Sequence, residues 1–341
     1  MARLKVRARR RQAEQLLAWA APYRPGTWAI ESANGLGYLL AQQLLAAGEA
    51  VLDVPATLAA RVRVLGNGRS NKNDPNDARA VAVAALRAPG LIPVRVEDHR
   101  TVLRLRAKHH TDLARWRNTR CGRLHALVAE LVAGGISKEI VGAQASQLLE
   151  RLDPVGAAAM ERHRLAVGLV DELDHVDAHL RAARRGIATA VTASGTTLTD
   201  TFGIGPVLAA MIIGYSGDPA RFPTAGHYAA YTGTAPVEFS SGGRVIHRLS
   251  RRGNRRLNHA LPMAAVTQIR HPHSPGRGDY DRTLADGKTP GEALRALKRR
   301  LADVVWRTLI ADAERARARR TVRDDSHIQR GRLNPEHRHF G

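Results

Sequence analysis

The 341-residue chain has one cysteine, few aromatic residues and no apolar segment of membrane-spanning length. The single cysteine, Cys121, excludes a disulfide framework and any zinc site built from several cysteines. Aromatic residues make up 4% of the chain, which argues against a stacking surface for single-stranded nucleic acid. Apolar runs such as Val207 to Ile213 are far too short to cross a bilayer, and the basic N-terminal segment lacks a signal-peptide core. We therefore expect a cytoplasmic protein without a membrane partner.

Basic residues, by contrast, are in large excess. Lys and Arg number 53 against 31 Asp and Glu, a formal charge of +22. A compact fold with this excess repels itself unless a polyanion shares its surface, so nucleic acid is the expected partner. The chain contains no phosphate-binding loop sequence, no H-E-x-x-H motif and no cysteine pair, so nucleotide hydrolysis and zinc catalysis are unsupported.

The first part of the chain alternates strand and helix. Residues 27–32 and 49–55 have the composition of strands, and the helix between them is expected to end at Gly48. A further helix opens near Asp74. Such alternation predicts a parallel sheet with crossover helices, and we assign an α/β domain to residues 1–95.

Two long helical patterns follow within residues 96–190. Residues 100–132 and 161–186 each carry an apolar stripe at helical spacing. The stripe residues are Leu113, Trp116, Leu124, Leu127 and Leu131 in the first pattern and Leu165, Leu169, Leu173, Val176 and Leu180 in the second. The patterns predict an antiparallel helical hairpin or a coiled coil, and an ordinary core-facing stripe explains them equally well.

Residues 191–313 predict a mostly helical domain with a small β-hairpin. Residues 198–217 have the pattern of a helix, a tight turn and a second helix, and residues 235–249 alternate around a turn at 240–243. Thr289 and Pro290 should begin a last amphipathic helix. From about Glu314 the chain is charged and poor in apolar residues, so we expect a frayed tail over 314–341.

Asp74 and Asp77 at the start of one expected helix admit two interpretations. Asp is a favoured N-cap and Pro75 fits the first helical position, so capping is the simpler interpretation and, in isolation, the favoured one. Alternatively, two carboxylates one turn apart can share a hard cation such as magnesium. Glu31 ends the first strand, at the edge where parallel sheets place their sites, and is the candidate for a third ligand.

Gly203 and Gly205 allow a tight turn, and Pro206 opens a helix whose free N–H groups can take a phosphate. This pattern resembles the helix-hairpin-helix element of DNA-binding proteins. A plain glycine turn between packed helices is equally well supported.

Ser240 and Ser241 stand at the turn of the expected hairpin. Most such serines are turn residues, and the G-x-S-x-G of a serine esterase is absent. A hydroxyl among so many positive charges is better suited to phosphodiesters than to acyl groups. The surrounding basic residues are Arg244, His247, Arg248, Arg251, Arg252, Arg255 and Arg256.

In their order along the chain, four stretches resemble the transposases of the IS110 insertion-sequence family. They are residues 28–48, 71–82, 201–261 and 287–309, and the resemblance runs from about residue 12 to residue 312. The family has a RuvC-like (RNase H-like) N-terminal domain with a D-E-D-D acidic set and a C-terminal domain with a catalytic serine. The resemblance implies a DNA transposase or recombinase that cleaves and exchanges the strands of an insertion sequence in a composite site.

The resemblance also implies roles for single residues. Glu31, Asp74 and Asp77 match the last three acids and would hold magnesium, while Ser241 would attack the scissile phosphate and form a transient phosphoserine–DNA link. The implied partners are double-stranded DNA at the element ends and target, a structured guide RNA, and further copies of the chain in a dimer or tetramer. The implied location is the nucleoid in a bacterial cytoplasm. The expected DNA contacts are Gly203, Gly205, Arg244, Arg248, Arg251, Arg252 and Arg255.

One departure from the family concerns the first acid, which family members carry on a strand preceding the one with Glu31. Here the only acid before Glu31 is Glu14, in a basic, helical context. We therefore expect a RuvC-like sheet without its first strand, either because the coding sequence starts further upstream or because the copy has decayed. A weakly active or inactive nucleic-acid-binding remnant is one alternative function, and a RuvC-like junction nuclease that hydrolyses with water is another.

Overall fold

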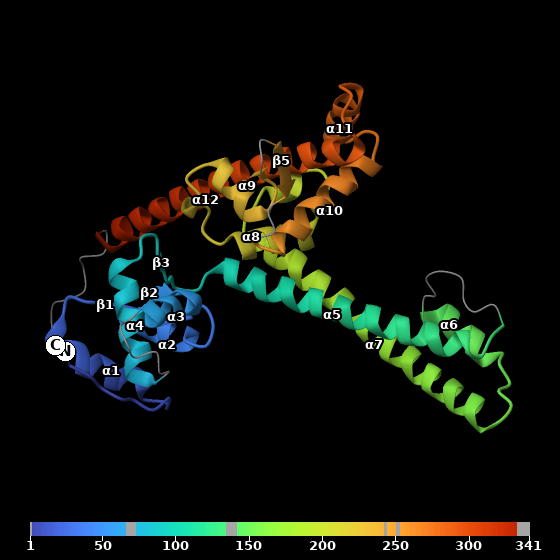
Figure 1. The fold of residues 1–341 in the computed structure, drawn as a ribbon, viewed down its shortest axis with the longest axis horizontal. Helices are drawn as coiled ribbons and strands as arrows, with labels where there is room; N and C mark the ends of the chain where they lie inside the picture. Colours follow the sequence, from blue (N-terminus) through green and yellow to red (C-terminus); the bar gives the residue numbers. More distant parts are fainter. Residues whose placement is uncertain (1, 66–72, 134–141, 242–243, 250–252, 333–341) are drawn as a thin grey trace, which may run out of the picture. The chain divides into compact units, whose positions relative to one another are not determined.

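The computed structural model describes residues 2–65, 73–133, 142–241, 244–249 and 253–332 (Figure 1). The chain divides into two compact units, Met1–Asp98 and His99–Gly341. Within the described ranges, no helix combines the length and apolar character needed to cross a membrane.

The first unit is a small sheet with helices on both faces. Strand β1 pairs in parallel with β2, and β3 pairs antiparallel with the other edge of β2. The α/β character and the parallel pair are thus confirmed, whereas α3 and the two-residue β3 were not expected. The elements are α1 (Gln12–Ala20), η1 (Ala21–Tyr23), β1 (Thr27–Glu31), α2 (Tyr38–Ala46), β2 (Ala50–Val54), α3 (Ala56–Leu65), α4 (Asp74–Arg87) and β3 (Ile92–Pro93).

The end of α2 confirms the role predicted for Gly48, whose φ is +81°. The Gly48 N–H donates to the Leu45 carbonyl and the Glu49 N–H to the Leu44 carbonyl, both at 3.0 Å. This pair of bonds is the Schellman motif, which satisfies the last carbonyls of a helix and turns the chain back. The turn delivers the chain directly into β2.

Side-chain alternation along β1 and β2 separates two small cores. Trp28 and Ile30 pack with α1 and α2 on one face, while Ala29 and Val54 pack with α3 and α4 on the other. Because successive residues of a strand point to opposite faces, this division also decides on which side each polar residue of these strands lies.

The second unit is predominantly helical. Its elements are α5 (His99–Ala129), α6 (Gly142–Glu150), α7 (Ala157–Ala193), η2 (Leu198–Asp200), α8 (Pro206–Ser216), η3 (Pro219–Arg221), α9 (Ala225–Thr232), β4 (Pro236–Ser241), β5 (Arg244–Leu249), α10 (Leu257–Arg270), α11 (Pro275–Ala285) and α12 (Pro290–Arg332). The predicted β-hairpin is confirmed as β4–β5. The helix predicted before the glycine turn is only the short 3-10 turn η2.

Helices α5 and α7 form the predicted antiparallel hairpin and run side by side (Figure 1). Leu113 packs against Val176 and Leu180, whereas Leu124, further along α5, packs in the same cluster as Val170, earlier in α7. Four of the five residues of the α7 stripe, from Leu169 to Leu180, are therefore packed within one chain and give no argument for an oligomer. Two residues depart from the predicted stripes: the side chains of Trp116 and Leu165 are exposed.

The main core of the second unit surrounds α8, which is buried on nearly every side. Gly214 lets α8 approach α5 closely, since a Cβ at this position would lie 2.6 Å from both the Cα and the N of Arg104. A contact this short with main-chain atoms cannot be relieved by a side-chain rotation. The glycine is therefore a packing requirement of this helix crossing.

We expect Gly214→Ala to lower the free energy of unfolding by about 2 kcal/mol or more, since overpacking outweighs the roughly 1 kcal/mol that alanine gains as a helix former. Chemical denaturation of the full chain measures the effect. Gly168→Ala in α7 is the matched control, because a Cβ there meets no atom within 4 Å. That variant should be up to about 1 kcal/mol more stable. Equal stability of the two variants would contradict the packing argument.

Helix α12 begins as predicted and ends later than predicted. Thr289 Oγ1 accepts from the Glu292 N–H at 3.3 Å, and Glu292 Oε2 accepts from the Thr289 N–H at 2.9 Å, which is a capping box. The Thr289 N–H lowers the pKa of Glu292. The frayed tail predicted from Glu314 is wrong as far as Arg332, because its Ala, Arg and Glu residues are good helix formers and continue the helix. Residues 333–341 lie outside the described residues.

Candidate functional site

The cap of α4 is Asn73, one residue before the predicted N-cap Asp74. The Asn73 side chain accepts from the Asn76 N–H at 2.9 Å, and its own backbone is extended, as an N-cap requires. Adjacent Asn and Asp residues compete for this position, and the sequence alone does not decide between them. The cap therefore leaves the carboxylates of Asp74 and Asp77 for other partners.

Both aspartates continue the sheet-facing side of α4. Asp74, Asp77, Val81 and Ala84 follow one another at intervals of three, four and three residues, which places them on one side of a helix. Val81 and Ala84 are buried in the core shared with Ala29 and Val54. The side chain of Asp77 is 26% exposed, while that of Asp74 is 81% exposed.

Glu31, the last residue of β1, pairs in register with Val54. It alternates with Ile30, so it shares the face of Ala29 and lies on the side of the sheet that α3 and α4 cover. Its neighbour Ser32 has a φ of +53°, and the Ser32 carbonyl accepts from Gly35 at 2.7 Å and from Gly37 at 3.1 Å. A left-handed serine is strained, and such strain concentrates at functional sites.

Basic side chains pair with both aspartates. Arg63 of α3 donates to Asp77, and Lys5 Nζ lies 3.2 Å from Asp74 Oδ2. In the described part of the chain, no three Asp, Glu, His or Cys side chains lie close enough together to hold a metal ion. The structure thus brings the three acids to one side of the sheet but does not assemble them into a metal site. Their role as ligands stays a prediction.

Asp53 of β2 is a polar residue that sequence reasoning missed. It pairs in register with Ile30, so it lies on the face opposite Glu31. Its Oδ2 accepts from Asn34 Nδ2 at 2.7 Å, and within the described ranges its buried Oδ1 has no hydrogen-bond partner. An aspartate inside an otherwise apolar strand, AVLDV, was the available signal. Asp53 holds the loop that follows Glu31.

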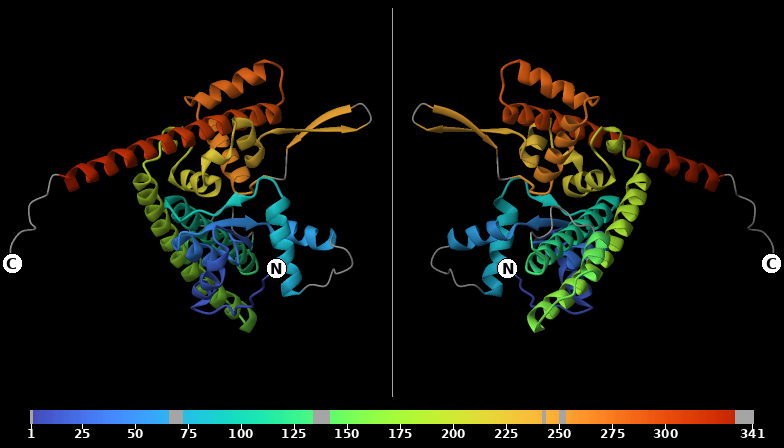
Figure 2. Two further views of the ribbon diagram at one scale, coloured as in Figure 1. Left: turned by 90° about the vertical axis from the view of Figure 1, so that its left-hand side faces the viewer. Right: turned by 90° about the vertical axis from the view of Figure 1, so that its right-hand side faces the viewer.

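The predicted nucleophile Ser241 is the last residue of β4 and pairs in register with Arg244, the first residue of β5. Ser240 pairs with Val245, and Arg248 pairs with Val237. Figure 2 shows this hairpin extending away from the helices of its unit. For the two strands the structure describes the backbone, and Arg251 and Arg252 lie outside the described residues. Arg255 is exposed just before α10.

The two glycines of the predicted DNA-binding turn differ in their surroundings. Gly203 has a φ of +84°, and a Cβ there would lie 2.8 Å from the Ala264 carbonyl oxygen, so packing against α10 explains this glycine. Gly205 is the N-cap of α8, and a Cβ there would meet nothing within 4 Å. The open N-terminus of α8 is compatible with a phosphate contact, which stays a prediction.

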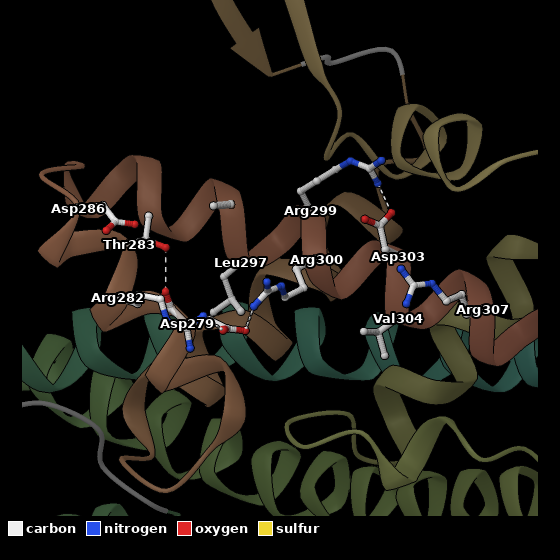
Figure 3. Close-up of a pocket in the computed structure, with 11 residues that line it drawn as sticks. Asp279, Arg282, Thr283, Asp286, Leu297, Arg299, Arg300, Asp303, Val304 and Arg307 are labelled. Carbon is white, nitrogen blue, oxygen red and sulfur yellow. Dashed lines mark hydrogen bonds and ion pairs between the residues drawn. The ribbon is translucent and has the colours of Figure 1, made fainter.

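A groove of about 740 Å³ between α11 and α12 contains none of the predicted site residues (Figure 3). Two ion pairs lie among the residues that line the groove. Arg300 of α12 pairs with Asp279 of α11, and Arg299 pairs with Asp303 within α12. Since most of its arginines already have acidic partners, the groove resembles a structural ion-pair network more than a binding site.

Comparison with known proteins adds two family matches. A model described as the transposase IS116/IS110/IS902 family matches residues 195–281, and a DEDD transposase model of the IS110 type matches residues 1–132. The hairpin with Ser241 lies in the first match, and Glu31, Asp74 and Asp77 lie in the second.

Individual relatives cover more of the chain than either family match does. The chain is 29% identical over 329 residues to the 44.8 kDa protein of insertion element IS116 from Streptomyces clavuligerus, covering 83% of this chain and 82% of the relative. It is 28% identical over 331 residues to the 42 kDa protein of insertion element IS900 from Mycobacterium paratuberculosis, with the same two coverages. A probable family 20 transposase of Pseudomonas aeruginosa is 28% identical over 209 residues, covering 59% of this chain and 61% of the relative.

Proposed function

Since the chain belongs to the IS110/IS116/IS902 family of insertion-sequence transposases, whose substrate is DNA, we propose that it cleaves and exchanges DNA strands with Ser241 as the nucleophile. One observation carries this assignment. Ser241 closes β4 directly opposite Arg244, inside the segment that matches the family. The α/β unit with its three-stranded sheet is consistent with a DEDD nuclease-like domain.

In the proposed reaction, the Ser241 hydroxyl oxygen attacks the scissile phosphorus. A phosphorus–oxygen bond to serine forms as the bond to the departing DNA oxygen breaks, so the backbone linkage is stored in a phosphoserine. Attack by a DNA hydroxyl on that phosphoserine then releases the serine and joins the new strands. Arg244, which pairs with Ser241, would neutralise the charge of the scissile phosphate, a task for which guanidinium groups are well suited. Arg248 lies four residues further along β5 and would contact a neighbouring phosphate.

Glu31, Asp74 and Asp77 are the residues that would hold magnesium. When bound, the ion would polarise the phosphate and stabilise the leaving oxygen. Two observations support these residues: Asn73 caps α4 in place of the aspartates, and all three acids lie on one side of the sheet. Arg63 pairs with Asp77 and Lys5 with Asp74, so both aspartates lie among positive charges.

Three finer parts of the proposal rest on the family resemblance and the basic composition. A structured RNA would guide the enzyme to its DNA, the chain would act as a dimer or tetramer, and Gly205 with Arg255 would contact the DNA backbone. The formal charge of +22 supports binding of the negatively charged backbones of DNA and RNA.

The test is covalent capture. The full chain is incubated with magnesium and duplexes that carry the element ends, and the products are separated under denaturing conditions. We expect a protein–DNA adduct that peptide mass spectrometry maps to Ser241. Cleavage without an adduct would support the junction nuclease that uses water, and binding without cleavage would support the catalytically impaired remnant.

A further inference from the structure

One flank of the α5–α7 hairpin carries paired cations in the half furthest from α8. Arg117 Nε donates to Asp177 Oδ1 at 2.6 Å, and Arg120 Nε donates to Glu172 Oε2 at 2.5 Å. Each of these arginines on α5 thus has an acidic partner on α7. Ion pairs across two packed helices leave this part of the flank close to electrically neutral.

In the half nearest α8, the same flank carries a histidine and an arginine that, among the described residues, has no acidic partner. His110 precedes Arg117 by seven residues and Arg184 follows Asp177 by seven, so both return to the same side of their helices. There Arg184 Nε donates to His110 Nε2 at 3.4 Å. Seven residues after Asp177, the equivalent position of α7 is thus an arginine, Arg184, instead of an acid.

Arg106 extends this run by one further turn. Its Nη1 lies 2.5 Å from the place that a Cβ of Gly186 would occupy, so the guanidinium lies across the glycine. Arg181 and Arg185 flank Arg184 on α7 and are exposed. In the described part of the chain, none of these four arginines lies within ion-pair distance of an acid.

These arginines repel one another, and the neighbouring imidazole of His110 does not reduce that repulsion because it carries no negative charge. Burial, Arg184 and His109 all lower the pKa of His110. Its neutral ring accepts from Arg184 and orients that guanidinium. The strip therefore presents oriented arginines on a rigid two-helix support.

We propose that this basic strip, formed by Arg106, His110, Arg181, Arg184 and Arg185, binds the phosphate backbone of double-stranded DNA. The inference rests on the proposed function, which supplies duplex DNA as substrate. A concentration of unpaired arginines costs free energy in a free protein and is compensated by a polyanion. The strip contains no Phe, Tyr or Trp on which unpaired bases could stack, so contacts to the backbone of a duplex are favoured.

The test compares charge removal in the two halves of the same flank. Binding of the full chain to a duplex is measured by fluorescence anisotropy over a series of salt concentrations. Each lost phosphate contact should lower the slope of log K against log salt by about 0.9, which corresponds to about fivefold weaker binding near 0.15 M salt. We expect this result for Arg184→Gln and for Arg106→Gln.

Arg117→Gln is the matched control. It removes the same charge from the same flank of α5, but from an arginine that Asp177 already neutralises. We expect its salt slope to equal that of the wild type. Thermal melting of all three variants checks the fold.

If all three substitutions weakened duplex binding equally, the effect would be one of general charge, and the proposal that the strip binds DNA would be overturned. No weakening by any of them, or weakening confined to a structured RNA probe, would also overturn it. If only the proposal for the basic strip is wrong, the wild-type protein still forms the covalent adduct on Ser241. If the proposed function fails, the wild type forms no adduct at all.

Discussion

Replacing Ser241 with alanine is expected to abolish the covalent protein–DNA adduct and strand exchange, a loss of about a thousandfold or more. The substitution removes the oxygen that would bond to phosphorus and leaves the hairpin backbone unchanged. Ser240→Ala is the matched control, because Ser240 pairs with Val245 rather than with Arg244. It should retain adduct formation within a few-fold of the wild type. Denaturing gels of the adduct and sequencing of the exchange products give the two measurements.

Binding to duplex DNA should survive Ser241→Ala with its steep salt dependence intact, because phosphate neutralisation releases counterions whether or not chemistry follows. If the Ser241→Ala variant still exchanged strands and the Ser240→Ala variant did not, Ser240 would be the nucleophile. Persistent hydrolysis in both variants would point to water as the nucleophile.

The second large effect is expected for Asp77→Asn, which should reduce adduct formation and exchange by about a hundredfold or more while changing DNA affinity little. Asn has the shape of Asp and still offers an acceptor to Arg63, so the contact between α3 and α4 can persist. The carboxylate charge on the sheet-facing side of α4 is lost. Titration with Mn²⁺, followed by electron paramagnetic resonance, should show weaker metal binding than in the wild type.

Two further variants separate chemistry from structure. Arg63→Gln breaks the ion pair while keeping the Asp77 carboxylate, so activity should persist. Asp53→Asn removes an acid from the opposite face of the same sheet but keeps an oxygen that can accept from Asn34, so it should also leave activity near the wild-type value. A loss in Arg63→Gln as large as that in Asp77→Asn would show that Asp77 acts only through its ion pair.

Features that depend on local chemistry could be predicted from the sequence. The two parallel strands, the Gly48 turn and the Thr289 cap each follow from a few adjacent residues. The antiparallel hairpin was one of several arrangements that its stripes allowed, because an apolar stripe does not specify its partner. The prediction of a frayed tail from Glu314 was wrong because a polar composition alone does not distinguish disorder from an exposed helix. The Ala, Arg and Glu residues of this segment favour helix.

Features of the site that depend on tertiary contacts could not be predicted. The sequence placed Glu31 at a strand end, but only the alternation against the packed helices shows which face it shares with Asp77. The Asn73 cap required a choice between adjacent residues with nearly equal preference. The meeting of Arg184 with His110 depends on the register of a 37-residue helix against a 31-residue one, which no local pattern determines.

The composition of the main core has a consequence for how the chain folds during synthesis. Its members span from Leu103 in α5 to Leu309 in α12, and α12 supplies Leu297, Leu301 and Val305 to the same cluster. The first unit, by contrast, has all its strands by Pro93 and can fold while the rest is still being translated. The apolar helix α8 leaves the ribosome before α10, which packs against it, and long before α12, which completes the same core. A nascent chain, or one that terminates before Leu309, therefore leaves this core incomplete and open to chaperones and proteases.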